Sequence, residues 1–324
     1  MTRSHRRRTR IGLWGAVMVG ATLFAGVALA DAKLTATRLA SDLAGATSVT
    51  QVPQDLEPPL AVAGAAEPLI VKNGCHLSRT GLRSIPCVYG DTASTVTVVL
   101  FGDSHAAYWF PALDEISREQ HWRLVDLTKD GCPAAEVDIA AWFRHGGPYP
   151  ECNDWRGSAM GQIAALHPAL VILSEARYLE VPEARPAAGV PTGQGSPWLD
   201  GLAATFRFLD RSAAHVVFIS DVPTPEKYPP GCVSRHLSDV RRCNTKLSAA
   251  IRLPVVKSEE LALARREHVD AVDPTSWFCT SAVCPDIVGN LFVYRNIAHM
   301  EPVWARFIAP VLADAIVPVM GGAG

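Results

Sequence analysis

The chain has 324 residues, of which 48% are hydrophobic and 19% are charged, and its formal net charge is −2 at neutral pH. These values fit one large α/β domain with a terminal extension. Beyond residue 30, 25 Lys and Arg side chains stand against 32 Asp and Glu side chains, so this part of the chain is acidic. Nucleic-acid binding, which usually needs a basic patch, is therefore not expected.

Residues 1–30 differ from the rest of the chain. Five arginines precede an uncharged stretch from Ile11 to Ala30, which is long enough to cross a bilayer at about 20 residues. The arginines favour a cytoplasmic amino terminus, so the chain after Ala30 is expected outside the cytoplasm. Ala28-Leu29-Ala30 also fits a signal-peptidase site. Two interpretations stay open: an uncleaved membrane anchor, and a secreted protein cleaved after Ala30.

Residues 31–68 are rich in Ala, Thr, Ser and Pro and predict a short juxtamembrane helix followed by a linker. From 69 to 320, strands and helices alternate. The predicted strands are Thr95–Phe101, Arg123–Leu127, Ala169–Ser174, Val216–Asp221 and Leu291–Tyr294. The predicted helices are Ala106–Glu119, Trp155–Leu166, Leu199–Ser212, Leu237–Ile251, Glu259–Arg266 and Pro302–Ile316. This alternation predicts an α/β fold with a doubly wound parallel sheet.

A polar turn, Gly102-Asp103-Ser104-His105, follows the first predicted strand. Ser104 is a candidate nucleophile, because ligands of open α/β sheets bind at the carboxyl ends of the strands. Gly102 permits a sharp exit from the strand, and the backbone N–H groups at the start of the next helix can stabilise an oxyanion. By itself, Gly-Asp-Ser also fits an ordinary turn with serine as helix N-cap.

A second polar turn, from Tyr294 to His299, follows the last predicted strand. A histidine at this place can act as general base toward Ser104. We therefore expect Ser104 and His299 within hydrogen-bond reach, or within one water of it.

Together the two blocks resemble the SGNH hydrolase superfamily, whose first block is Gly-Asp-Ser and whose last is Asp-x-x-His. The chain is more closely similar to the SGNH domain fused to acyltransferase-3 membrane proteins of bacteria, which O-acylate surface glycans. The similarity spans roughly Leu69 to Ala315 and includes Gly74-Cys75-His76, Gly131-Cys132-Pro133, Asp221-Val222-Pro223 and Trp277-Phe278-Cys279.

The resemblance implies a flavodoxin-like sheet and an exported serine esterase or O-acyltransferase. Its expected substrates are acyl esters, acetyl above all, of cell-surface glycans, and no cofactor or metal is expected. A transferase would need an acyltransferase-3 membrane partner in trans to deliver the acyl group. In the fused proteins a membrane helix precedes the SGNH domain, which favours the anchor interpretation of residues 11–30.

One departure from the superfamily pattern concerns the triad acid. Asn296 stands three residues before His299, where the pattern has aspartate, so the expected triad lacks its carboxylate. Asp221, at the end of another predicted strand, could line the pocket or replace the missing acid. The alternative to an enzyme is a catalytically impaired glycan-binding or accessory module of an acyltransferase-3 system, in which the asparagine marks lost catalysis.

The second departure concerns the oxyanion hole. The strand that ends at Ser174 brings no asparagine to this edge, so Ser174 or Arg177 could contribute beside the backbone N–H groups of Ser104 and Gly131. Asp103 is expected to accept hydrogen bonds within its turn, and His105 could contact substrate or cap the helix.

The eight cysteines fall as four pairs that are local in sequence: Cys75 with Cys87, Cys132 with Cys152, Cys232 with Cys243, and Cys279 with Cys284. In an oxidising compartment, an even number of cysteines indicates disulfides. Zinc binding is the alternative, but no pair has the close Cys-x-x-Cys spacing with histidine partners that zinc sites show.

Overall fold

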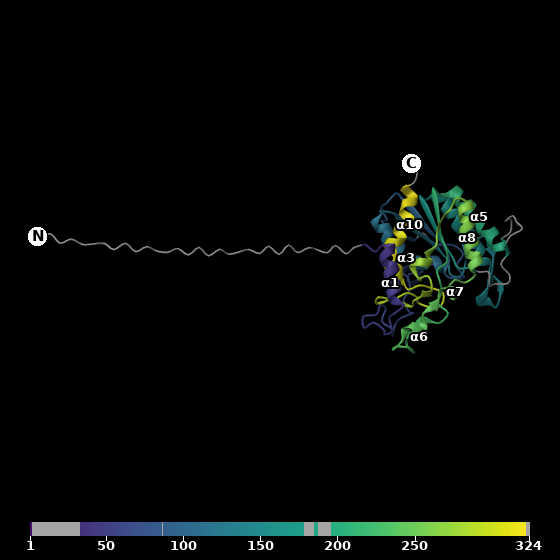
Figure 1. The fold of residues 1–324 in the computed structure, drawn as a ribbon. Helices are drawn as coiled ribbons and strands as arrows, with labels where there is room; N and C mark the ends of the chain where they lie inside the picture. Colours follow the sequence, from purple (N-terminus) through teal and green to yellow (C-terminus); the bar gives the residue numbers. More distant parts are fainter. Residues whose placement is uncertain (2–32, 86, 178–184, 187–195, 322–324) are drawn as a thin grey trace. The chain divides into compact units, whose positions relative to one another are not determined.

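The computed structural model describes residues 1, 33–85, 87–177, 185–186 and 196–321 (Figure 1). Residues Leu34–Gly324 form one compact unit. The predicted membrane segment Ile11–Ala30 lies outside the described residues. In the described part of the chain, no helix combines the length and the apolar character that a membrane span requires.

A six-stranded sheet lies at the centre of this unit, in the order β1-β3-β2-β7-β9-β11. Its strands are β1 (Cys87–Gly90), β2 (Thr97–Gly102), β3 (Arg123–Thr128), β7 (Leu170–Ser174), β9 (His215–Ile219) and β11 (Asp270–Val272). Neighbouring strands are parallel, except that the edge strand β1 runs antiparallel to β3. The parallel strands have the flavodoxin-like order 2-1-3-4-5, so the topological switch point lies between β2 and β7.

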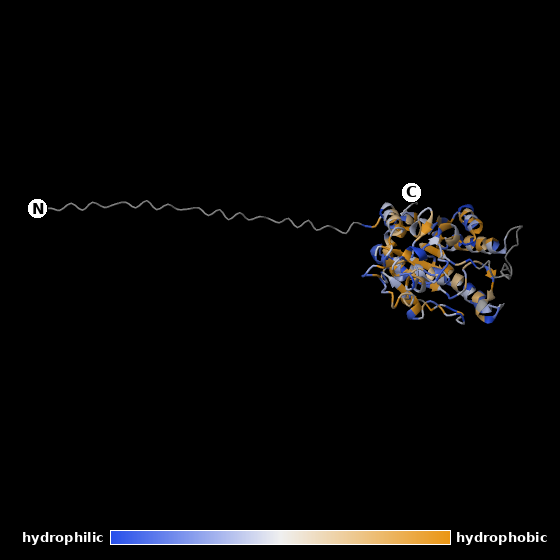
Figure 2. Cartoon of the chain, turned by 60° about the horizontal axis from the view of Figure 1, so that its bottom comes forward, coloured by the Kyte–Doolittle hydropathy of each residue, from blue (hydrophilic) through white to orange (hydrophobic). Residues whose placement is uncertain are grey.

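Helices cover both faces of the sheet. Alternate residues of β2 face opposite layers, Val98 and Leu100 on one side and Val99 and Phe101 on the other. One layer holds α1 (Ala36–Ala46), α3 (Ser104–Glu119), α9 (Pro302–Phe307) and α10 (Ala309–Gly321), and the other holds α4 (Pro150–Leu166), α5 (Pro197–Ser212) and α8 (Pro254–Arg266). Because both faces are buried, the central strands are near-continuous apolar runs, as predicted. In Figure 2 the helices carry both hydrophobic and hydrophilic residues, as helices with one buried side do.

The remaining elements are shorter, and the label η marks a 3₁₀-helix. They are α2 (Leu69–Lys72), β4 (Val137–Asp138), β5 (Ala140–Ala141), η1 (Trp142–Arg144), β6 (Gly147–Pro148), β8 (Arg185–Pro186), α6 (Pro229–Val233), η3 (Val240–Cys243), β10 (Thr245–Lys246), α7 (Leu247–Ala250), η4 (Pro274–Trp277), β12 (Val283–Cys284), β13 (Ile287–Val288) and β14 (Leu291–Phe292).

The predicted strand Leu291–Tyr294 is wrong as a member of the central sheet. Only Leu291–Phe292 is a strand, and β14 pairs antiparallel with β13 in a separate two-stranded sheet. Two strands of the central sheet, β1 and β11, were not predicted. Both lie at sheet edges, and their residues are half-buried or exposed, so neither shows an apolar run.

The predicted helix Leu237–Ile251 is also wrong. This segment contains η3, β10 and the single turn α7. The disulfide Cys232–Cys243 and the pairing of β10 with β12 hold it in this irregular path. The other predicted helices are present with shifted bounds, and the predicted helix Pro302–Ile316 is divided into α9 and α10.

The segment predicted as a juxtamembrane helix and linker packs on the domain. Leu39, Leu43 and Ala46 of α1 are buried in the same apolar core as α3 and α10. The hydroxyl of Thr35 caps this helix by accepting from the Arg38 N–H at 3.2 Å. Residues 34–68 therefore belong to the compact unit.

The four disulfides of the structure are the four predicted pairs. Cys75–Cys87 joins the segment after α2 to the edge strand β1. Cys132–Cys152 joins the loop after β3 to α4. Each bond closes a short loop, and bonds of this kind contribute about 3 kcal/mol for a loop of about 15 residues.

Candidate active site

The turn between β2 and α3 places Ser104 at the switch point of the sheet. Gly102 has φ +144°, and an added Cβ would overlap the carbonyl oxygen of Ser174 on β7, so only glycine fits. Asp103 is the N-cap of α3: its Oδ1 accepts from the His105 N–H at 2.8 Å, and its Oδ2 accepts from the Ala176 N–H at 2.9 Å. Asp103 thus fixes the turn, as predicted, and ties it to the chain after β7.

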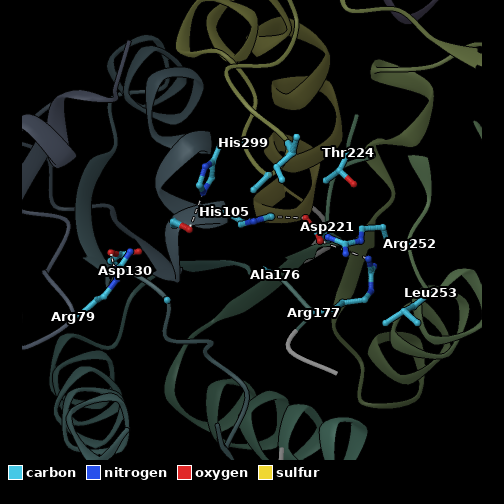
Figure 3. Close-up of a pocket in the computed structure, with 14 residues that line it drawn as sticks. Arg79, His105, Asp130, Ala176, Arg177, Asp221, Thr224, Arg252, Leu253 and His299 are labelled. Carbon is cyan, nitrogen blue, oxygen red and sulfur yellow. Dashed lines mark hydrogen bonds and ion pairs between the residues drawn. The ribbon is translucent and has the colours of Figure 1, made fainter. Parts of the chain in front are cut away.

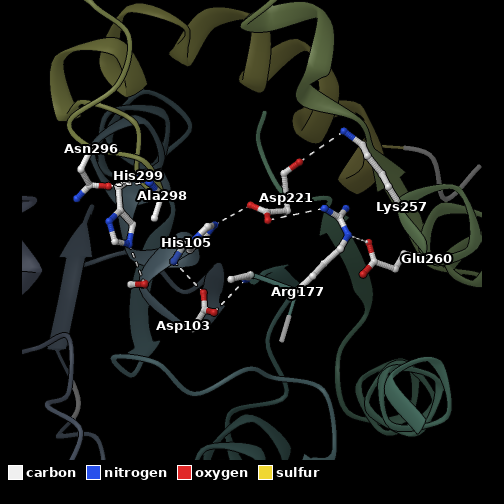
Figure 4. Close-up of polar contacts among 11 residues, drawn as sticks. Asp103, His105, Arg177, Asp221, Lys257, Glu260, Asn296, Ala298 and His299 are labelled. Carbon is white, nitrogen blue, oxygen red and sulfur yellow. Dashed lines mark hydrogen bonds and ion pairs between the residues drawn. The ribbon is translucent and has the colours of Figure 1, made fainter. Parts of the chain in front are cut away.

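His299 Nε2 lies 2.9 Å from Ser104 Oγ, within hydrogen-bond distance. The histidine comes from the loop between β14 and α9 and not from the end of a central strand. The side-chain oxygen of Asn296 accepts from the backbone N–H groups of Ala298 and His299, both at 2.8 Å. Asn296 therefore shapes the turn that presents His299, and its side chain binds the backbone of this loop, not the imidazole (Figure 4).

The other nitrogen of His299, Nδ1, is buried, and no hydrogen-bond partner for it exists among the described residues. The ring stacks on Tyr108, with centroids 4.4 Å apart and an interplanar angle of 19°. Asp221, which the sequence offered as a replacement for the missing acid, binds His105 instead, with its carboxylate 2.6 Å from His105 Nδ1. Ser104 and His299 therefore form a dyad in the described structure.

Burial lowers the pKa of His299 well below its usual value, and the positive charges of His105 and Arg295 lower it further. The imidazole is consequently neutral at neutral pH. A neutral imidazole can accept the Ser104 proton.

A chain of charged groups leads away from His105 (Figure 4). Asp221, which follows β9, lies 3.7 Å from Nη1 of Arg177. Nε of Arg177 donates to Glu260 on α8 at 2.7 Å, and the indole N–H of Trp198 donates to the same carboxylate at 2.8 Å. Arg177 is thus held at the cavity wall by two carboxylates.

These contacts set the charge of His105. Burial alone would lower its pKa, but Asp221 raises the pKa of His105 to about 9. Burial likewise opposes ionisation of Asp221, yet His105 and Arg177 hold the pKa of Asp221 below its usual value. The pair is therefore ionic at neutral pH.

Ser104 and His299 lie in a cavity of about 410 Å³. The lining residues are Arg79, Ser104, His105, Asp130, Gly131, Ala176, Arg177, Asp221, Thr224, Arg252, Leu253, Ile297, Ala298 and His299. Figure 3 shows Arg79 and Asp130 at one end and Arg252 and Leu253 at the other. Gly131, with φ +64°, lines this cavity, whereas Ser174 lines a smaller hollow behind His105 and His299.

Sequence reasoning missed several residues of the site. Tyr108 stands four residues after Ser104, one helical turn along α3, and this spacing is the only signal that marks it. Glu260 carries no signal, because α8 is distant in sequence from the other elements of the site.

Comparison with solved structures shows the fold. The periplasmic domain of a lipopolysaccharide acetyltransferase from Salmonella ser. Paratyphi A is similar with a TM-score of 0.52 and 15% identity, over 76% of this chain and 86% of that chain. A peptidoglycan O-acetylesterase has a TM-score of 0.37 and 14% identity, over 62% of this chain and 48% of that chain. A carbohydrate acetylesterase family member from Sinorhizobium meliloti has a TM-score of 0.37 and 12% identity, over 68% of this chain and 99% of that chain. The similarity of the last two is too weak to support a conclusion.

No curated protein matches the chain. A family model described as the SGNH domain fused to AT3 domains matches residues 74–314. This range contains the turn with Ser104, the loop with His299 and every strand of the central sheet. The chain therefore belongs to the SGNH domain family that this model describes.

Proposed function

We propose that this protein is an extracytoplasmic serine esterase or O-acyltransferase that acts on acyl esters, acetyl above all, of cell-surface glycans. The observation that carries the proposal is the 2.9 Å contact between Ser104 Oγ and His299 Nε2 in an accessible cavity. The similar lipopolysaccharide acetyltransferase domain supports the choice of substrate class.

In the first half-reaction, Ser104 Oγ attacks the acyl carbonyl carbon and its proton passes to His299 Nε2. Backbone N–H groups at the start of α3 and at Gly131 stabilise the oxyanion. The carbonyl then re-forms, the bond to the alcohol oxygen breaks, and His299 returns the proton to that oxygen. Water completes hydrolysis of the acyl-serine, whereas a sugar hydroxyl completes transfer.

The lack of an acceptor at His299 Nδ1 among the described residues limits the rate. In a serine protease, replacing the triad aspartate by asparagine costs about 10⁴ in kcat, because the histidine is then held in the wrong tautomer. We expect slow turnover relative to enzymes with a full triad.

The four disulfides support a place in an oxidising compartment. We propose that residues 11–30 deliver the domain there, as an uncleaved anchor or as a signal peptide cleaved after Ala30. For acyl transfer, an AT3 membrane protein in trans would supply the acyl group, and this suggestion rests on the family to which the chain belongs. Ester hydrolysis needs no such partner.

The unpartnered Nδ1 of His299 also favours a second candidate, a glycan-binding accessory module without turnover. A fluorophosphonate probe and 4-nitrophenyl acetate separate the two. The enzyme proposal predicts covalent labelling at Ser104 and ester turnover, both lost in Ser104→Ala. A folded wild-type protein without either, which still binds acylated glycan, would establish the accessory module.

A further inference from the structure

We propose that His105 is a second catalytic imidazole of this site: as a cation held by Asp221, it donates its Nε2–H to the substrate oxygen that becomes negative when Ser104 attacks. The inference rests on the proposed function, because it needs an acyl ester at Ser104. It assigns chemistry to a residue whose position also suits a purely structural role in the first turn of α3.

The geometry leaves one donor of His105 available to a ligand. Nδ1 is bound to Asp221 Oδ1 at 2.6 Å, and the backbone N–H is bound to Asp103 Oδ1 at 2.8 Å. Among the residues that the structure describes, Nε2 has no hydrogen-bond partner, although the side chain lines both the main cavity and the hollow behind it. His105 and the nucleophile Ser104 thus line the same cavity, and one ring N–H of His105 is available to a ligand there.

The groups around His105 keep it charged. The negative charges of Asp221 and Asp103 favour its charged form, whereas burial and the positive charge of Arg177 oppose it. The neutral His299 ring lies 5.2 Å away, centroid to centroid. Asp221 is in turn fixed by Arg177 and, through its backbone carbonyl, by Lys257 Nζ at 3.5 Å. A carboxylate held in this way favours the imidazolium form of its partner.

Protonated His105 lies where its charge can stabilise a negatively charged transition state. The rings of His105 and His299 have centroids 5.2 Å apart, and Ser104 Oγ lies 2.9 Å from His299 Nε2. A positive charge there opposes protonation of His299 but stabilises a negative oxygen on the substrate. No acceptor for His299 Nδ1 exists among the described residues, and the end of β7 brings no asparagine side chain to the oxyanion. His105 therefore supplies electrostatic stabilisation of the negative substrate oxygen. His105 keeps its own proton throughout, and the Ser104 proton passes only to His299.

The first test compares His105→Gln with wild type in hydrolysis of 4-nitrophenyl acetate. Loss of one preorganised donor predicts a fall in kcat of about 10²-fold with KM nearly unchanged. His121→Gln is the matched control, because His121 forms an exposed pair with Asp91 at 3.1 Å, away from the cavity. Intact disulfides and an unchanged circular dichroism spectrum verify the fold of each variant.

The second test measures how kcat depends on pH, because the charge of His105 changes with pH. Wild-type kcat should fall as pH rises through about 9, where His105 loses its proton. Asp221→Asn should move this alkaline limb to lower pH, because burial and Arg177, which lower the pKa of His105, would then act without the carboxylate that raises it. An NMR titration of the His105 ring nitrogens should show the same shift when Asp221→Asn is added to Ser104→Ala, a background without turnover.

The outcomes separate this inference from the proposed function. If wild type neither turns over nor is labelled at Ser104, the proposed function fails. If wild type turns over but His105→Gln keeps the wild-type kcat, the role of His105 fails alone. A loss seen with glycan acetates and absent with 4-nitrophenyl acetate would also overturn it, because His105 would then bind the glycan and not the reacting oxygen.

Discussion

The imidazole of His299 lies flat against the phenol ring of Tyr108, one turn along α3 from Ser104, with centroids 4.4 Å apart. The Arg295 guanidinium also lies near this pair, 5.8 Å from the Tyr108 ring centroid. Because the described residues offer His299 Nδ1 no acceptor, the base is oriented by the stacked Tyr108 ring, the Asn296 turn and the contact of Nε2 with Ser104 Oγ. The Tyr108 ring thus supports the imidazole where a triad would have a hydrogen bond from Nδ1 to a carboxylate.

Tyr108→Leu should therefore lower kcat while leaving KM nearly unchanged. An aromatic pair contributes about 0.5–1.5 kcal/mol beyond area burial, so the expected fall is about 2- to 13-fold. Tyr108→Phe is the matched control and should stay close to wild type, because it keeps the stacked ring. Equal losses in both variants would show that the hydroxyl matters and the stacking does not.

Asn296→Asp should fail to create a working triad, because the residue 296 side chain binds backbone N–H groups and not the imidazole. An aspartate can accept the same two bonds, so the fold should persist. Asn296→Ala, which loses the oxygen that accepts both bonds, should lower kcat more than Asn296→Asp does. The comparison uses initial rates with 4-nitrophenyl acetate. A rise of tenfold or more in Asn296→Asp would mean that the loop rearranges to bring the carboxylate to Nδ1.

The sequence predicted the strands that are buried on both faces, because such strands are continuous apolar runs. Strand β2 is covered on both faces, so its apolar run was visible, whereas the edge strand β11 is partly exposed and was not. Ser104 and His299 could be paired because each follows an apolar run, although the run before His299 belongs to the small β13–β14 sheet. The spacing of Asn296 suited both a triad acid and a turn cap, and only the hydrogen bonds distinguish them. Glu260 reaches the site from α8, and no local pattern marks a contact between such distant elements.

Gly102→Ala should destabilise the protein by about 3 kcal/mol, because its Cβ would overlap the Ser174 carbonyl oxygen at φ +144°. Urea unfolding of the oxidised protein measures the loss. The matched control is Gly157→Ala in α4, where an added Cβ meets nothing within 4 Å. That change should stabilise the helix by about 1 kcal/mol. A Gly102→Ala variant as stable as wild type would show that β2 and β7 can separate at this turn.

The acid side of the pH profile should report His299. Activity needs the neutral imidazole, so kcat falls as pH decreases through the pKa of His299, which burial, His105 and Arg295 hold well below the usual value. Wild type should therefore keep its full rate to a pH below about 6.5, the ordinary histidine value.

Arg295→Gln removes one of these positive charges while keeping a planar polar side chain beside Tyr108. The pKa of His299 should rise, and the acid limb of kcat should move to higher pH, even if the plateau rate also changes. Arg241→Gln is the matched control, because Arg241 is an exposed arginine paired with Asp239 at 2.7 Å. Its profile should match that of wild type. An acid limb that stays in place in Arg295→Gln would mean that burial and His105 alone set the charge of the base, and that Arg295 acts only through its bond to Glu67 at 3.0 Å.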